Sequence, residues 1–305
     1  MPNFANLFRR APTVGAPVAT TTTTNLAYPY APIVIQPPLV AGQGDPSQTI
    51  FRMLEEIRSF PVGAQFFMAL SAADKQIGVR YAGPNNNQAA GGVRGYVLLR
   101  QKHDAQNAVA FGLELQQTLN NLQAATGNGI PWVAERLHHQ EVTTWQNGQV
   151  RPYRNPVPLV VAAPHAGNGP KTLPQTPLAI IAGLINAYVA GTALPSRNEA
   201  DAIMLVLEDY LNPGAGVASR IYFDPHKEVV NGMTRPPHCG LFHELTHAYY
   251  NALGRQLGRE DSLDEGNGGR LFELMSVGLG PFATRPFSEN AFRTALGIPL
   301  RLTYP

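Results

Sequence analysis

Apolar side chains recur with a helical period in several parts of the chain. In residues 47–60 (SQTIFRMLEEIRSF), apolar positions follow an i, i+3, i+4, i+7 spacing, which predicts an amphipathic helix with Ser47 as its N-cap. Pro61 and Gly63 end this helix and precede a second short helix over Gly63–Ala73. Further helices are predicted over the second half of Ala105–Ala125, which is otherwise ambiguous, and over Leu178–Ala190 and Glu199–Tyr210.

Short apolar runs bounded by turn residues predict strands between these helices. Gln76–Ala82 and Val93–Arg100 are two such runs, separated by the loop GPNNNQAAGG. Pro158–Ala163 and Ala218–Phe223 are two more. Because helices and strands are mixed along the chain, we expect an α+β fold.

The first 45 residues differ in composition from the rest of the chain. Thr20–Thr24 form a homopolymeric run, and prolines recur as far as Pro38. Such a segment buries too little apolar surface to offset the entropy that it would lose on ordering. We therefore expect residues 1–45 to be disordered, as a flexible tail or as a secretion leader, and residues 46–305 to form one folded domain.

The segment PPHCGLFHELTHAYYNALGR carries an HExxH motif that begins at His243 and ends at His247. Two histidines four residues apart lie one turn apart on the same face of a helix, where both imidazoles can bind one Zn²⁺. Glu244 can reach a water on the metal without being a ligand, and would act as general base in hydrolysis. Prolines suit the start of this helix and Gly254 suits its end. The strand predicted over Ala218–Phe223 comes just before the helix, where it can pair with an extended substrate.

A catalytic zinc takes three protein ligands, so the two histidines leave one position to be filled. No histidine follows in residues 251–258, which excludes the metzincin spacing, and a downstream carboxylate is the remaining choice. Asp264 and Glu265 lie in a polar, glycine-rich stretch. Glu273 lies in an apolar helical segment, GRLFELMSVG, where a lone carboxylate needs a partner. We favour Glu273 as the third ligand and keep the acidic loop as the alternative.

The C-terminal sequence SENAFRTALGIPLRLTYP offers donors for the oxyanion of a tetrahedral intermediate. Arg301 and Tyr304 are three residues apart, and a guanidinium or a phenol can donate this hydrogen bond. A surface arginine and a core tyrosine are the alternative interpretation. Three further polar residues of this segment are either buried groups that hold the site in place or ordinary helix-end residues: Glu289, Asn290 and Arg293.

Composition narrows the classes of partner. Charged residues make up only 14% of the chain, the net charge is +2, and no run of Lys or Arg marks a surface for nucleic acid. No apolar run reaches transmembrane length, so we expect no membrane partner. The single cysteine, Cys239, excludes an internal disulfide, and we interpret it as a buried residue of the motif helix. We interpret His226 and His238 as structural or solvent-facing, and we expect a monomer.

Three segments form a combination that is more specific than HExxH alone: HELTHAYYN, the glutamate within FELMSVG, and ENAFRTALGIPLRLTY. Upstream, FRMLEEIRSFPVGAQFFMAL with IGVRY, and NPGAGVASRIYFDP, extend the pattern. Together these segments, in residues 47–82 and 212–305, resemble the bacterial effector zinc metallopeptidases typified by NleD. Those proteins are gluzincin-like proteases that type III secretion delivers into host cells.

The resemblance implies a zincin-like domain with Glu244 as the general base. The zinc ligands that it implies are His243, His247 and Glu273. Arg301 and Tyr304 resemble the Arg-x-x-Tyr pair of clostridial neurotoxin light chains, which helps to stabilise the transition state. The resemblance also implies secretion by a bacterium, action in the host cytoplasm, and cleavage of host MAP kinases in the activation loop. Two alternatives stay open: a zinc hydrolase of something other than protein, and a non-enzymatic effector that uses this fold to bind a host protein.

Overall fold

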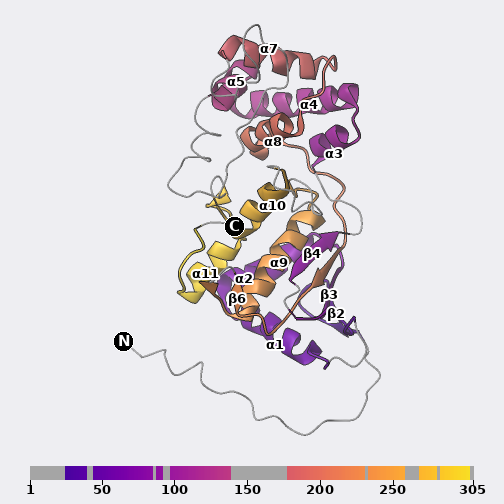
Figure 1. Ribbon diagram of the computed structural model, residues 1–305, viewed down its shortest axis with the longest axis vertical. Coiled ribbons are helices and arrows are strands. Elements are labelled where there is room, and N and C mark those ends of the chain that lie inside the picture. Colours follow the sequence, from indigo (N-terminus) through magenta and orange to yellow (C-terminus); the bar gives the residue numbers. More distant parts are fainter. Residues whose placement is uncertain are drawn as a thin grey trace.

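The computed structural model shows a mixed α+β fold (Figure 1). A sheet with several helices forms the lower part of the molecule in Figure 1, and a separate group of helices forms the upper part. The α+β fold class predicted from the sequence is confirmed. The residues that the structure describes are 25–39, 44–84, 87–91, 97–138, 177–230, 233–257, 268–279 and 282–302.

The sheet contains five strands, β1 (Leu26–Ala27), β2 (Ile33–Gln36), β3 (Ile77–Arg80), β4 (Gln88–Gly91) and β5 (Ser219–Tyr222), in the order β1-β2-β3-β5-β4. β2, β3 and β5 are parallel, and the edge strands β1 and β4 are antiparallel to their neighbours. β3 and β5 confirm two of the predicted strands. β5 is paired on both sides, however, so the expectation that Ala218–Phe223 pairs with a substrate is wrong. Among the described residues, β4 is the edge strand on this side of the sheet.

The N-terminal region enters the fold earlier than its composition predicts. Residues 25–39 are part of the sheet, since β2 pairs with β3 along its whole length. Ile33 and Ile35 are buried on one face of β2, and the Tyr28 hydroxyl donates a hydrogen bond to the Leu54 carbonyl oxygen at 3.3 Å. The expectation of disorder through residue 45 is therefore wrong for residues 25–39. Alternating apolar residues between prolines form a strand here because an ordered partner strand is available.

Four helices share one hydrophobic core with the sheet: α1 (Ser47–Arg58), α2 (Pro61–Ala72), α9 (Pro237–Ala252) and α11 (Glu289–Leu296). α1 and α2 confirm the two helices predicted first along the chain. Ser47 lies in the first turn of α1, because Pro46 occupies the cap position, and Pro61 begins α2. The turn between them is tight, since a Cβ on Gly63 would lie 1.9 Å from the Ile57 carbonyl oxygen.

The upper group comprises α3 (Leu98–Asp104), α4 (Ala108–Thr126), α5 (Ile130–His138), α7 (Leu178–Val189), α8 (Arg197–Val206) and a 3-10 turn, η3 (Glu208–Tyr210). α4, α7 and α8 confirm predicted helices, and α5 was not predicted. The strand predicted over Val93–Arg100 is wrong in its described part, because Leu98 begins α3. Leu99 and His103 are four residues apart and both buried, so this apolar run covers one face of a helix. Pro158–Ala163 lies outside the described residues. Within the described part, no helix is both long and apolar enough to span a membrane.

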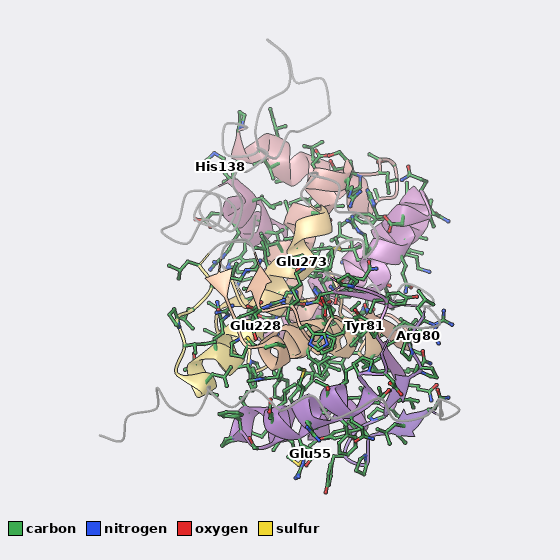
Figure 2. The ribbon with its side chains drawn as sticks, turned by 60° about the horizontal axis from the view of Figure 1, so that its bottom comes forward. Glu55, Arg80, Tyr81, His138, Glu228 and Glu273 are labelled. Carbon is green, nitrogen blue, oxygen red and sulfur yellow. The ribbon has the colours of Figure 1, made fainter. Side chains whose placement is uncertain are left out.

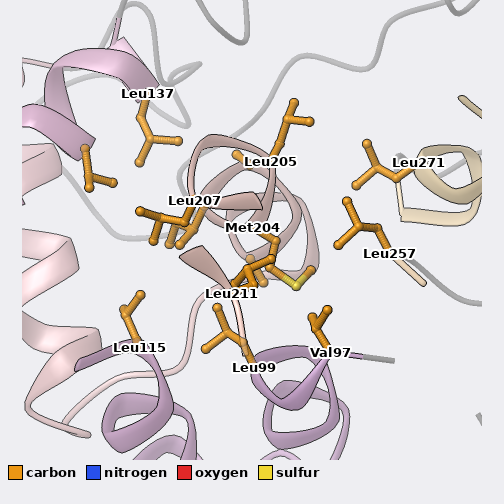
Figure 3. Close-up of a cluster of buried hydrophobic side chains, with 14 of the residues drawn as sticks. Val97, Leu99, Leu115, Leu137, Met204, Leu205, Leu207, Leu211, Leu257 and Leu271 are labelled. Atoms are coloured by element: carbon orange, nitrogen blue, oxygen red, sulfur yellow. The ribbon is translucent and has the colours of Figure 1, made fainter. Parts of the chain in front are cut away.

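Two hydrophobic cores meet along α9. Leu245 packs into the core that includes the sheet, whereas Tyr250 belongs to the core of the upper helices. α10 (Gly268–Val277) contributes Leu271 to this second core, where Figure 3 shows it with Leu257 and Met204. α9 and α10 also contact each other directly. The HExxH helix is therefore held from both sides, which fixes its position against α10.

Candidate metal centre

The HExxH helix begins after a short hairpin, β6 (Val229–Val230) and β7 (Met233–Thr234), and its ends follow local rules. Pro237 occupies the first helical position, where a missing N–H leaves no bond unmade. Gly254 follows the helix with φ +64°, and a Cβ there would lie 2.2 Å from a carbonyl oxygen of the loop around residue 214. Leu245 packs toward the sheet, and this burial turns His243 and His247 toward α10.

The structure brings both histidines together with Glu273, which α10 contributes near the centre of the molecule (Figure 2). The Nε2 atoms of His243 and His247 are 3.1 Å apart. Glu273 Oε2 lies 3.1 Å from His243 Nε2 and 3.4 Å from His247 Nε2. All three side chains are buried. Glu273 thus occupies the place predicted for the third ligand, and the alternatives Asp264 and Glu265 lie outside the described residues.

The polar partners on the far sides of the two imidazole rings influence which nitrogen atoms are left to bind a metal on the near sides. His243 Nδ1 lies 3.0 Å from Glu289 Oε2, and His247 Nδ1 lies 2.8 Å from Ser276 Oγ. When each Nδ1 carries the ring proton, both Nε2 atoms present lone pairs to the Glu273 carboxylate. Three acceptors then converge, which is unfavourable unless a cation lies among them. Ligands about 2.0–2.1 Å from a tetrahedral zinc lie roughly 3.3 Å apart, so this donor set fits zinc.

Charges within the site shift the pKa values of the predicted ligands in opposite directions. Burial lowers the pKa of His243, but hydrogen bonds with Glu273 and Glu289 outweigh it and raise this pKa to about 9. Burial raises the pKa of Glu273, but the charges and hydrogen bonds of His247 and His243 outweigh it and hold this pKa well below its ordinary value. Without a cation, a proton is therefore the bound positive charge, and a metal must displace it.

Glu244 has the environment of a group that moves protons. It follows His243 directly and is only 5% exposed. Burial raises its pKa above the ordinary value for glutamate, although the charges of His243 and His247 oppose this shift. A carboxylate whose pKa is raised toward neutrality is a more effective general base, and a more effective acid after it takes up a proton.

Glu289 is the centre of a buried ionic cluster behind His243. It is fully buried, and its Oε1 accepts a hydrogen bond from Arg293 Nε at 2.7 Å. Its Oε2 lies 3.0 Å from His243 Nδ1, 3.2 Å from Arg301 Nη1 and 3.5 Å from Arg235 Nη1. Burial raises the pKa of Glu289, but the hydrogen bond with His243 and the surrounding charges outweigh it, so the pKa is lowered. Glu289 therefore stays ionised and orients the His243 ring.

The C-terminal segment is attached to α11 and through it to the site. Asn290 accepts a hydrogen bond from the Arg301 backbone N–H at 2.8 Å and donates one to the Arg301 carbonyl oxygen at 2.9 Å. Arg293 Nη1 donates to the Pro299 carbonyl oxygen at 3.0 Å. The Arg301 side chain, predicted as an oxyanion donor, contacts Glu289. Tyr304 lies outside the described residues.

Two residues of this site were missed by the sequence analysis. Ser276 follows Glu273 by three residues on α10, a helical spacing that could have suggested a shared face. Arg235 precedes the prolines at the start of α9, and no local pattern distinguishes it.

His226, His238 and Cys239 behave as predicted. His238 Nδ1 lies 3.2 Å from Glu56 Oε2, and burial lowers its pKa to about 4. His226 is exposed. Cys239 is buried, which raises its pKa to about 12, so it remains a thiol.

An α+β fold in which an HExxH helix faces a glutamate from a following helix has the arrangement found in metallopeptidases. A comparison with protein families agrees with this class. The model of the Peptidase M91 family, described as an effector protein, matches residues 42–304, and the chain belongs to this family. It is thus a peptidase-family effector protein. Comparisons with curated proteins and with solved structures give no match.

Proposed function

We propose that this effector is a zinc-dependent endopeptidase that hydrolyses a host protein. The observation that carries the proposal is the convergence of three buried metal-ligand atoms beside Glu244, within a chain of a peptidase family. His243, His247 and Glu273 would hold the zinc. When bound, the zinc supplies Lewis acidity to the substrate carbonyl group and to the attacking water.

The protein's own groups carry the proton transfers and the positioning. Glu244 takes a proton from the attacking water and returns it to the nitrogen of the leaving amine. Glu289 and Ser276 hold the two imidazole rings in orientation. Arg301 and Tyr304 are proposed, from the resemblance, to stabilise the developing oxyanion. Arg301 contacts Glu289 behind His243, so this role would require its side chain to turn toward the metal ligands.

The outer edge of β4, which no described strand pairs with, is the proposed binding surface for the substrate backbone. β4 pairs with β5 through one edge and contacts α9, the helix that carries the motif. An extended peptide can add to the other edge by main-chain hydrogen bonds. This arrangement favours a protein substrate over a small molecule, because a strand edge recognises extended backbone.

Delivery and substrate choice are proposed from the resemblance to NleD-like effectors. The protein would be secreted by a bacterium through a type III system and would act in the host cytoplasm. Host MAP kinases, cut in the activation loop, are the substrates that the resemblance suggests. The effector family supports delivery into a host in general terms.

A survey of new protein N-termini in a eukaryotic cell lysate tests the proposal. The zinc-loaded protein is compared with its Glu244→Gln variant, which retains the ligands but lacks the base. We expect a small set of new termini with the wild-type protein alone, at equal zinc content in both proteins. Identical lysates would refute the peptidase proposal. A host complex that forms equally well with the Glu244→Gln variant would then favour the non-enzymatic alternative.

A further inference from the structure

Arg235 is a buried cation next to the site that the proposed mechanism does not use. It lies between β7 and α9 and is only 4% exposed. Its guanidinium lies flat against Gly240, because a Cβ on Gly240 would be 3.0 Å from Nη2 and 3.2 Å from both Cζ and Nε. Any larger residue at this point of the helix would have to displace the guanidinium.

The charge of Arg235 is weakly compensated by the residues that the structure describes. Its one ion pair there joins Nη1 to Glu289 Oε2 at 3.5 Å, beyond hydrogen-bond distance. The same carboxylate also serves His243, Arg293 and Arg301. Arg235 Nε is buried and has no hydrogen-bond partner in the described part of the chain. A buried guanidinium with an unused donor is costly unless an acceptor from outside completes it.

The position of Arg235 along α9 relates it to the proposed general base. Gly240 and Glu244 are four residues apart, and therefore lie on the same face of the helix, one turn from each other. Glu244 must face the leaving amine to protonate it. Arg235 packs on Gly240, and it therefore lies over the face of α9 that also carries Glu244.

We infer that Arg235 forms a specificity subsite for an anionic side chain of the substrate, on the leaving-amine side of the cut. The inference rests on the proposed peptidase function and adds a substrate class to it. The paired N–H groups of a guanidinium match two oxygens of a carboxylate or of a phosphate ester. Either group on a substrate side chain could therefore bind Arg235 in the same way. The low exposure of Arg235 is no obstacle, since Glu244 is equally buried and must also meet the substrate.

Matched peptide hydroxamates test the subsite by binding alone. One pair carries Glu or Gln as the side chain on the leaving-group side, and a second pair carries phosphoserine or serine. We expect the zinc-loaded wild-type protein to bind the anionic member of at least one pair roughly 10- to 100-fold more tightly than the neutral member, as measured by titration calorimetry. The pair that shows this ratio distinguishes a carboxylate from a phosphate ester.

Variants then assign the preference to Arg235. Arg235→Gln should reduce the ratio to about one, whereas Arg52→Gln, which removes an exposed charge on α1, should preserve it. Arg235→Lys keeps the charge without the fork and should give an intermediate ratio. This variant provides the test if Arg235→Gln fails to fold or loses zinc. Equal affinities within both pairs, or a ratio that survives Arg235→Gln, would overturn the inference. Because hydroxamate binding needs no turnover, these outcomes are separate from failure of the lysate survey, which tests the peptidase function itself.

Discussion

Replacement of Glu289 by glutamine is expected to weaken zinc binding without touching a zinc ligand. Glutamine keeps the volume of the side chain but removes the charge that faces His243 Nδ1 at 3.0 Å. Its amide can present an N–H as readily as an oxygen, so the His243 ring loses the acceptor that sets its tautomer and its orientation. Loss of such a partner typically costs 10- to 100-fold in metal affinity, or about 1.4–2.7 kcal/mol.

The same substitution should also reduce the stability of the metal-free protein. Glu289 is fully buried and is the acceptor for Arg293 at 2.7 Å and for Arg301 at 3.2 Å. Removal of one partner from a buried ionic cluster leaves uncompensated charge and costs about 3–5 kcal/mol. Urea unfolding of the metal-free protein measures this loss, and competition with a chelator of known affinity measures zinc binding in the fraction that is folded.

Glu56→Gln is the matched control for Glu289→Gln. Glu56 also contacts a histidine of α9, at 3.2 Å from His238 Nδ1, but His238 is not among the predicted ligands, and the Glu56 side chain is 58% exposed. The control should leave zinc affinity within about twofold of the wild-type value and stability within about 0.5 kcal/mol. If Glu289→Gln bound zinc as tightly as this control does, the role assigned to Glu289 would be wrong.

Two further predictions concern the pH dependence of the site and the packing of the first two helices. The folded-state pKa of His243 is raised to about 9 from 6.5, so its protonation stabilises the metal-free protein fully below pH 6.5, and this contribution is lost as the pH rises through 9. Zinc must displace that proton, so the apparent zinc affinity should rise about tenfold per pH unit between pH 6.5 and 9. Calorimetry in buffers of different ionisation enthalpy should show about one proton released on zinc binding. A zinc affinity that does not change with pH would contradict this prediction. Gly63→Ala places a Cβ 1.9 Å from the Ile57 carbonyl oxygen and should destabilise the protein by about 1–3 kcal/mol in urea unfolding. Gly183→Ala on α7, where the new Cβ meets nothing within 4 Å, should instead stabilise it by about 0.5–1 kcal/mol, and equal effects of both substitutions would refute the packing argument.

Local periodicity was sufficient to predict the parts of the site that lie on single helices. The spacing of His243 and His247 puts both on one helix face whatever surrounds the helix, because 3.6 residues complete a turn. The apolar context of Glu273 also predicted a helix, and a buried carboxylate there needed a positive partner. Family-specific segments added the expectation of a peptidase effector, which the family comparison confirms in its coarser form.

Tertiary structure decided what surrounds these groups. Glu289 and Arg301 were candidates for buried supports or oxyanion donors, and only the packing of α11 against α9 makes Glu289 a partner of His243. Arg235 had no local signal at all, because its burial depends on the space over Gly240, which α9 offers only after the chain has folded.

Two predictions about the sheet were wrong for the same reason. Residues 25–39 resemble a disordered tail in composition, yet they form strands because β3, about forty residues later, supplies the hydrogen-bond partner. The strand at Ala218–Phe223 was predicted correctly, but both of its edges are occupied because β3 and β4 pair with it on opposite sides. Helix faces are determined by residues a few positions apart, and so the sequence by itself determined the HExxH face. Strand pairing and ion pairing join residues far apart in the chain, so only the tertiary structure could decide them.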